Sequence, residues 1–221
     1  MKAMILAAGF GTRLKPITET IPKALVVHKG KTLLETQISK LMSLNVSEIL
    51  VNSHHFSPQI EQFIKDKNFG IPVTIIKENV ILGTGGAVIN AEPHFKDEDY
   101  FVLLNVDIDS DMDINEMLRF HKKNIPLATL AVQNRESKRK LEFNKKMHLI
   151  GRQHDNSDHD RLYAFNGLHV ISPEFFKIRM PHQYSDIIDC YEMLLDDSTV
   201  LGYEYKNVEF KDIGKIENLK A

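Results

Sequence analysis

Leu6-Ala-Ala-Gly-Phe-Gly-Thr-Arg13 decides the fold, because it joins a short apolar run to a loop with two glycines and a cation. The run from Met1 to Ala7 predicts a buried strand. Gly9 and Gly11 leave room where backbone N–H groups can approach phosphate oxygens closely. Arg13 adds a planar fork of donors, and Lys23 further on adds a compact positive charge. The stretch therefore predicts a phosphate-binding loop at the end of a strand.

Two familiar phosphate-binding motifs are excluded by their spacing. A dinucleotide-binding fingerprint requires a third glycine at position 14, where this chain has Leu14. A P-loop requires Gly-Lys-Ser or Gly-Lys-Thr after four intervening residues, and no such triplet follows Gly9. The loop belongs to another class of phosphate site.

Outward from this loop, short apolar runs alternate with helical patterns. This alternation favours parallel strands joined by crossover helices, and hence an α/β fold with a mostly parallel sheet. The expected strands are 1–7, 48–52, 73–76, 100–104, 128–132 and 168–171, and the expected helices include 33–42, a helix that opens at 57, 85–91 and 186–195.

One segment interrupts the alternation. Residues 133–160 are polar, rich in Lys, Asp and His, and without a clear period. They predict a hairpin or mobile flap outside the packed core. Neither a repeat nor a linker divides the chain, so one domain over 1–221 is expected.

Composition limits the partners and the location. The net charge of -2 gives no general attraction to nucleic acid, and no apolar run approaches the roughly 20 residues that span a bilayer. The single cysteine, Cys190, permits no internal disulfide and is expected to be a small core residue. We expect a cytoplasmic protein that binds neither nucleic acid nor a membrane.

An acidic segment follows the expected strand 100–104. Asp107 lies just beyond its carboxyl end, where α/β sheets hold ligands, and its oxygens suit Mg²⁺. The alternating Asp109, Asp111 and Asp113 lack the glycine and glutamate of a calcium loop, and predict a solvated turn and helix start.

Five segments together resemble the sugar-1-phosphate nucleotidyltransferases. They are Leu6 to Lys23, Leu82-Gly-Thr-Gly-Gly-Ala87, Asn105-Val-Asp107, Phe165-Asn-Gly-Leu-His-Val-Ile-Ser172 and Phe210-Lys-Asp-Ile-Gly214. The resemblance implies a single three-layer αβα catalytic domain, Rossmann-like and similar to glycosyltransferase-A folds. It also implies that the short chain lacks the β-helix that longer members append.

The resemblance also implies roles for individual residues. Arg13 and Lys23 would be catalytic, Asp107 and Asp212 would hold Mg²⁺, and Asn166 and Gly167 would contact the sugar. The nucleotide would be bound by Ala8, Gly9, Gly11, Thr12, Arg13, Lys23, Glu78, Gly83, Gly86 and Asn105. Val106 and Lys215 depart from the usual family pattern.

The implied reaction joins the nucleoside monophosphate part of an NTP to a sugar 1-phosphate. Val51-Asn-Ser-His-His55 and Ile187-Ile-Asp189 resemble N-acetylmuramate 1-phosphate uridylyltransferases, which places UTP slightly ahead. Leu82 to Ala87 also resembles mannose or heptose 1-phosphate guanylyltransferases. A catalytically silent nucleotide-sugar binding protein is a third hypothesis.

Overall fold

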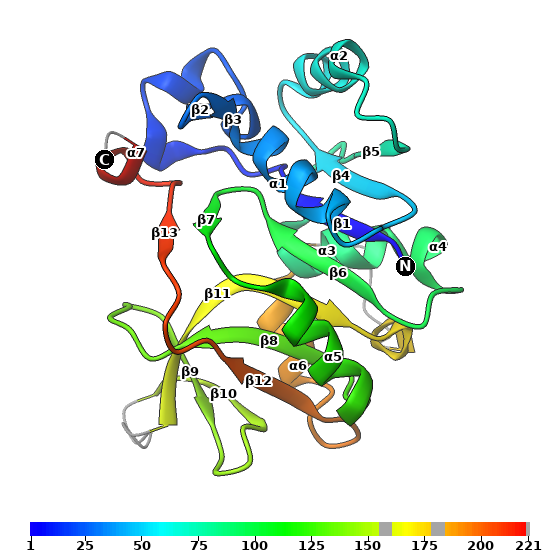
Figure 1. Ribbon diagram of the computed structural model, residues 1–221, viewed down its shortest axis with the longest axis vertical. Helices are drawn as coiled ribbons and strands as arrows, with labels where there is room; N and C mark the ends of the chain where they lie inside the picture. The colour runs from blue at the N-terminus through cyan, green and yellow to red at the C-terminus, as the bar shows by residue number, and fades with distance from the viewer. Residues whose placement is uncertain (155–160, 178–183, 220–221) are drawn as a thin grey trace.

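The computed structural model describes residues 1–154, 161–177 and 184–219, and in these ranges nine strands form one sheet (Figure 1). The order is β10-β9-β11-β6-β1-β4-β5, with β8 paired to β11 and β12 paired to β8. These strands are β1 (Ala3–Leu6), β4 (Ile49–Ser53), β5 (Val73–Lys77), β6 (Phe101–Asn105), β8 (Ala128–Gln133), β9 (Lys140–Phe143), β10 (Leu149–Arg152), β11 (Leu162–Ile171) and β12 (Val200–Glu204).

The two halves of this sheet differ in strand direction. β6, β1, β4 and β5 are parallel neighbours, with Ile5 opposite both Val51 and Leu104, which confirms the predicted parallel sheet. β11 runs antiparallel to β6, β8 and β9. Apolar runs predict that these segments are strands, but a strand's direction depends on which neighbour it pairs with.

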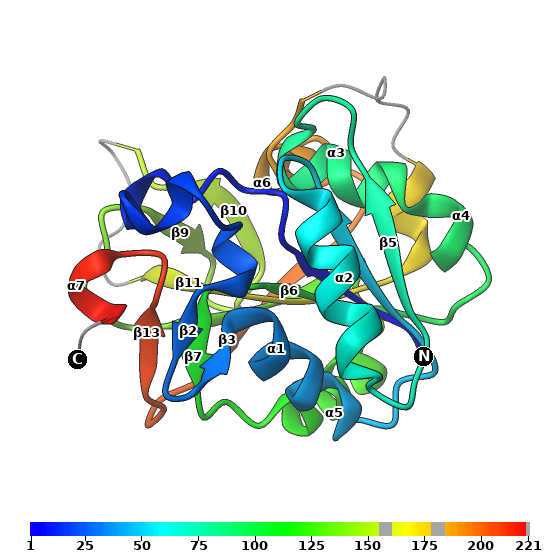
Figure 2. The same cartoon turned by 90° about the horizontal axis from the view of Figure 1, so that it is seen from above.

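Helices cover both faces of the sheet and complete three layers. Figure 2 shows α1 and α5 on one face and α3, α4 and α6 on the other. Ala3 and Ile5 belong to the core on the α1 side, while Met4 between them belongs to the opposite core, as strand alternation requires. The helices are α1 (Leu33–Met42), α2 (Ser57–Lys67), α3 (Gly83–Asn90), α4 (Glu92–Phe95), α5 (Ile114–Asn124), α6 (Ile187–Glu192) and α7 (Ile216–Leu219). The predicted α/β fold in three layers is confirmed.

The segment 133–160 was predicted as a hairpin or a mobile flap, and it contains a hairpin. Within it, β9 and β10 pair antiparallel, and β9 joins the main sheet through β11. Buried apolar side chains of this hairpin are Leu141, Phe143 and Leu149. The prediction that this segment stays outside the packed core is therefore wrong, because four-residue strands are too short to show a period in the sequence. Residues 155–160 lie outside the described residues, and movement of the segment stays a prediction.

Two small ladders lie beside the main sheet. β2 (Val27–His28) pairs with β3 (Lys31–Thr32), and β7 (Ile108–Ser110) pairs antiparallel with β13 (Phe210–Asp212). The second ladder brings the C-terminal part of the chain back to the end of β6 (Figure 1). Among the helices of the described ranges, none is long and apolar enough to cross a membrane.

Candidate active site

The glycine-rich loop begins where β1 ends and continues through three short 3-10 turns, η1 (Thr12–Leu14), η2 (Ile17–Glu19) and η3 (Lys23–Leu25). Gly11 has a φ of 65°, in the left-handed region that glycine adopts readily. A Cβ there would lie 2.9 Å from Thr18 Cγ2 and 3.0 Å from Lys23 Cβ. Thr18 Oγ1 donates a 2.8 Å hydrogen bond to the Gly11 carbonyl. Gly11 is thus required both by the turn and by the close packing of Lys23.

A buried asparagine fixes the start of the loop. Asn52, at the end of β4, accepts a 2.7 Å hydrogen bond from the Ala7 N–H and donates one of 2.7 Å to Glu78 Oε1. Glu78 Oε2 accepts from the Leu82 N–H at 3.1 Å. Sequence reasoning missed Asn52, whose signal is a polar residue at the end of an apolar strand. Glu78 was expected to contact the nucleotide, and both its oxygens already have protein partners.

Two cations and two carboxylates meet beside this loop. Lys23 Nζ lies 2.6 Å from Asp107 Oδ2, and Arg13 Nη2 lies 3.6 Å from the same oxygen. Arg13 Nη1 donates to Asp212 Oδ2 at 2.7 Å, across a separation of 199 positions in the chain. The Lys23 side chain is 15% exposed, whereas that of Arg13 is 53% exposed. The structure therefore brings together the four charged residues that the resemblance implied, with Arg13 open to solvent.

The opposite charges in the cluster keep one another ionised by shifting the pKa values of Asp107 and Arg13. Burial alone would raise the pKa of Asp107, but the charge of Lys23 and its hydrogen bond lower that pKa below the usual range. The hydrogen bond to Asp212 raises the pKa of Arg13, against the effect of partial burial. Asp107 and Arg13 are therefore both charged at neutral pH.

The β7–β13 ladder places Asp212 beside Asp107. Asp212 pairs in register with Ile108, and the Ile213 N–H donates to the Asp107 carbonyl at 2.8 Å. Gly214 follows, and its lack of a side chain leaves a small space between the acidic groups. A Cβ there would lie 2.9 Å from Asp212 Oδ1 and closer still to Asp107 Oδ2. Two carboxylates that converge on one space match Mg²⁺, which needs only one or two protein carboxylates beside phosphate and water.

No group of three or more His, Cys, Asp or Glu side chains suited to a metal occurs in the described ranges. His169 is buried and contacts the Tyr191 hydroxyl through Nδ1 at 3.0 Å, and burial lowers its pKa to about 3. His54 Nδ1 lies 2.8 Å from the Glu78 carbonyl. Both histidines therefore make hydrogen bonds within the fold. Cys190 is buried, as expected.

A cavity of about 380 Å³ opens next to the charged cluster. Predicted site residues in its wall are Ala8, Gly9, Gly11, Thr12, Lys23, Glu78, Gly83, Asn105 and Asp107. Wall residues that were not predicted are Leu6, Phe10, Asn52, Ile81, Thr84, Tyr184 and Asp186. The loop and the ends of β1, β4 and β6 thus converge on one space. No local motif in the sequence identifies Tyr184 or Ile81 as lining this cavity.

The glycines of α3 are also needed for packing within the protein, whatever they contact in a ligand. At Gly83 a Cβ would clash with the Ser185 carbonyl, and at Gly85 it would lie 2.6 Å from Cys190 Sγ. The Gly85 N–H donates to the Ser185 carbonyl at 2.9 Å. These glycines let α3 pack closely against the segment that precedes α6. Gly86 is buried in α3 and is not in the cavity wall, so its nucleotide contact stays a prediction.

Asn166 and Gly167 do not reach the cavity wall. Asn166 is fully buried, and its Oδ1 accepts a 3.0 Å hydrogen bond from Arg135 Nε. Gly167 has a φ of 69°, and a Cβ there would lie 2.8 Å from Asn105 Nδ2. The guanidinium of Arg135 also lies 4.0 Å from the centre of the Phe210 ring. Sequence reasoning missed this arginine, and the sugar contact of Asn166 and Gly167 stays a prediction.

Two curated proteins similar to this chain are both named as mannose-1-phosphate guanylyltransferases. A mannose-1-phosphate guanyltransferase of Neurospora crassa is 37% identical over 135 residues, which cover 60% of this chain and 37% of that protein. The mannose-1-phosphate guanylyltransferase catalytic subunit beta of Danio rerio is 29% identical over 184 residues, 80% of this chain and 51% of that protein. The chain therefore spans about half or less of the length of these two relatives.

Solved structures share the fold over nearly the whole chain. A putative glucose-1-phosphate thymidylyltransferase from Bacillus anthracis has a TM-score of 0.86 at 20% identity and covers 100% of this chain and 92% of its own. HddC from Yersinia pseudotuberculosis complexed with GMP-PN has a TM-score of 0.80 at 21% identity, with coverage of 99% and 96%. Residues 2–143 match the family model described as nucleotidyl transferase, and the chain belongs to that family.

Proposed function

We propose that this protein transfers the nucleoside monophosphate part of an NTP to a sugar 1-phosphate, giving a nucleotide sugar and pyrophosphate. The observation that carries the proposal is the cluster of Arg13, Lys23, Asp107 and Asp212 beside the cavity. Membership of the nucleotidyl transferase family and the activities named for the relatives support it. Phosphoryl-type chemistry needs mainly positioning and charge stabilisation, which this cluster supplies.

In the proposed reaction, an oxygen of the sugar phosphate attacks the α-phosphorus of the NTP. The bond from that phosphorus to the bridging oxygen of the β-phosphate breaks, and pyrophosphate leaves with the electron pair. Lys23, held at the edge of the cavity, would neutralise charge near the α-phosphate. The more exposed Arg13 would meet the negative charge that grows on pyrophosphate. No general base is needed, because a phosphate nucleophile is already ionised at neutral pH.

Mg²⁺ is part of the proposal, with Asp107 and Asp212 as its protein ligands. The space kept open by Gly214 between the two carboxylates is the observation that fits it. When bound, the ion would supply positive charge to the triphosphate. In the structure Lys23 contacts the Asp107 carboxylate and Arg13 contacts the Asp212 carboxylate. Once the ion occupied these carboxylates, both cations would be free to contact the substrate phosphates.

For the substrates we propose GTP with mannose 1-phosphate or a related sugar 1-phosphate. The activities of the curated relatives favour this pair over UTP with N-acetylmuramate 1-phosphate, which the sequence motifs alone place slightly ahead. UTP with N-acetylmuramate 1-phosphate is therefore the second candidate. Two motifs favour it, Val51 to His55 at the end of β4 and Ile187 to Asp189 at the start of α6.

The test is a matrix of the common NTPs against several sugar 1-phosphates, scored by pyrophosphate release with Mg²⁺ present. We expect the highest rate with GTP and mannose 1-phosphate, and a rate near background for Lys23→Ala. A preference for UTP and N-acetylmuramate 1-phosphate would select the second candidate. Tight binding of a nucleotide sugar without pyrophosphate release from any pair would refute the enzyme and support a silent binding protein.

A further inference from the structure

The turn that carries Asp107 is buried, and in the described part of the chain the strand β7 that follows it has a strand partner on one edge only. Val106 is 1% exposed and Ile108 is 4% exposed. β7 pairs with β13 along one edge only, and no second strand pairs with it among the described residues. Carbonyl groups on the other edge must find partners elsewhere, because buried backbone groups rarely stay unpaired.

Side chains from α1 supply those partners. Gln37 Nε2 lies 2.6 Å from the Ile108 carbonyl oxygen and 3.4 Å from that of Val106. One helical turn further on, Lys40 Nζ donates to the Ser110 carbonyl at 2.7 Å. The three carbonyls belong to alternate residues, and carbonyls two residues apart share one edge of a strand. Helix α1 thus takes the place of a third strand beside β7.

Gln37 is an unusual choice for this place. It is fully buried, and its Oε1 has no hydrogen-bond partner among the described residues. A buried acceptor without a partner is unfavourable for stability. The amide nitrogen is the feature that an apolar side chain lacks, and it lies within hydrogen-bond distance of the carbonyls on either side of Asp107.

We infer that Gln37 is a positioning residue for the Asp107 carboxylate. It holds the carbonyls before and after Asp107 against α1, whose N-terminus is capped by Thr32 through the Glu35 N–H. Asp212 lies on β13, which pairs with β7. The position of Asp212 therefore also depends on the contacts between α1 and β7. This inference rests on the proposed function, since it concerns the two carboxylates assigned to Mg²⁺.

The test compares metal binding by wild type, Gln37→Met and a matched control. Met keeps the length of the side chain and removes both donors. Ser172→Ala is the control, because Ser172 is buried and donates a 2.9 Å hydrogen bond to the Pro126 carbonyl away from the cavity. Mn²⁺ is titrated into each protein alone and followed by loss of the free-ion EPR signal. We expect Gln37→Met to bind Mn²⁺ about 10-fold to 100-fold more weakly, as removal of outer-shell partners commonly does.

Kinetics give a second readout. Pyrophosphate release by Gln37→Met should need a correspondingly higher Mg²⁺ concentration and recover toward the wild-type rate at saturation, with Ser172→Ala unchanged. Mn²⁺ affinity equal to that of wild type would overturn the inference. If Gln37→Met does not fold, Lys40→Met replaces it, with a weakening of a few-fold expected and an unchanged affinity again overturning the inference. Absence of turnover in wild type would refute the proposed function, while the Mn²⁺ comparison would still decide the role of Gln37.

Discussion

Replacement of Gly214 by alanine tests the space between the two carboxylates. The new Cβ would lie 2.7 Å from Arg13 Nη2 and 2.9 Å from Asp212 Oδ1, and nearer still to Asp107 Oδ2. Non-bonded carbon and oxygen atoms need roughly 3.4 Å, so the Asp107 oxygen must move by about 1 Å. A displacement of about 1 Å in a catalytic site costs on the order of 100-fold in rate. We therefore expect Gly214→Ala to lower kcat by about 100-fold.

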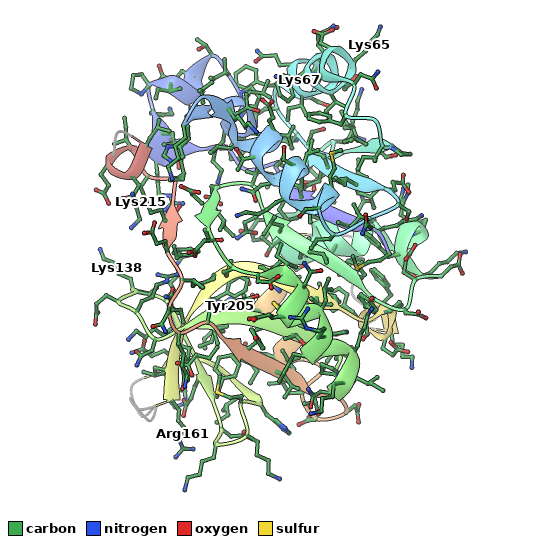
Figure 3. The ribbon with its side chains drawn as sticks, viewed as in Figure 1. Lys65, Lys67, Lys138, Arg161, Tyr205 and Lys215 are labelled. Atoms are coloured by element: carbon green, nitrogen blue, oxygen red, sulfur yellow. The ribbon has the colours of Figure 1, made fainter. Side chains whose placement is uncertain are left out.

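Stability should change little in this variant, because carboxylates and a guanidinium at the edge of a cavity can shift without disturbing the core. Gly→Ala also reduces the freedom of the unfolded chain, which offsets some strain. The assay is pyrophosphate release together with thermal unfolding. Lys215→Ala is the neighbouring control, since Lys215 lies beside α7 (Figure 3) and pairs only weakly, at 3.9 Å, with Glu217. A kcat for Gly214→Ala within a few-fold of wild type would refute the inference that the reaction needs the space between Asp107 and Asp212.

Four further predictions address the charges, the buried His121 and the segment with β9 and β10. Asp107→Asn and Asp212→Asn should each lower turnover about 100-fold or more with the fold retained. Near-normal activity of either variant at saturating Mg²⁺ would show that the substituted aspartate is not a metal ligand. Arg13→Ala should lower kcat more than it raises the KM for NTP, and an unchanged kcat with only a higher KM would make Arg13 a binding residue. Burial lowers the pKa of His121 to about 4. As the pH falls from about 6.5 to 4, only the unfolded state takes up this proton, and the contribution of His121 to the free energy of unfolding should fall by about 1.4 kcal/mol per pH unit. Urea unfolding at pH 7 and pH 5 measures this fall, and an equal pH dependence in His121→Gln would contradict it. Backbone amides in 133–154 should gain protection from hydrogen exchange when the nucleotide sugar binds, and unchanged protection would argue for a rigid segment.

Local spacing was enough to predict a glycine-rich loop directly after the first strand. Gly9, Gly11 and Arg13 lie within a few positions of one another, and a loop after a strand has little freedom in how it presents them. The parallel strands β1, β4, β5 and β6 were also predictable, because short apolar runs separated by amphipathic helices have few other arrangements.

Spacing could not pair distant groups. Asp107 and Asp212 were linked only through resemblance, and their proximity depends on the β7–β13 ladder, which consists of strands too short to carry a pattern. The same limit hid the strands β9 and β10.

By itself, the sequence determined which chemical groups this protein carries. It also determined the glycine-rich loop that presents Arg13. Tertiary structure alone decided which of those groups meet. Asn52 closes the start of the loop and Gln37 holds the turn at Asp107, and nothing in the spacing of either residue marks it. Both act through hydrogen bonds across the chain, and such bonds are set by how helices pack on the sheet rather than by any local period.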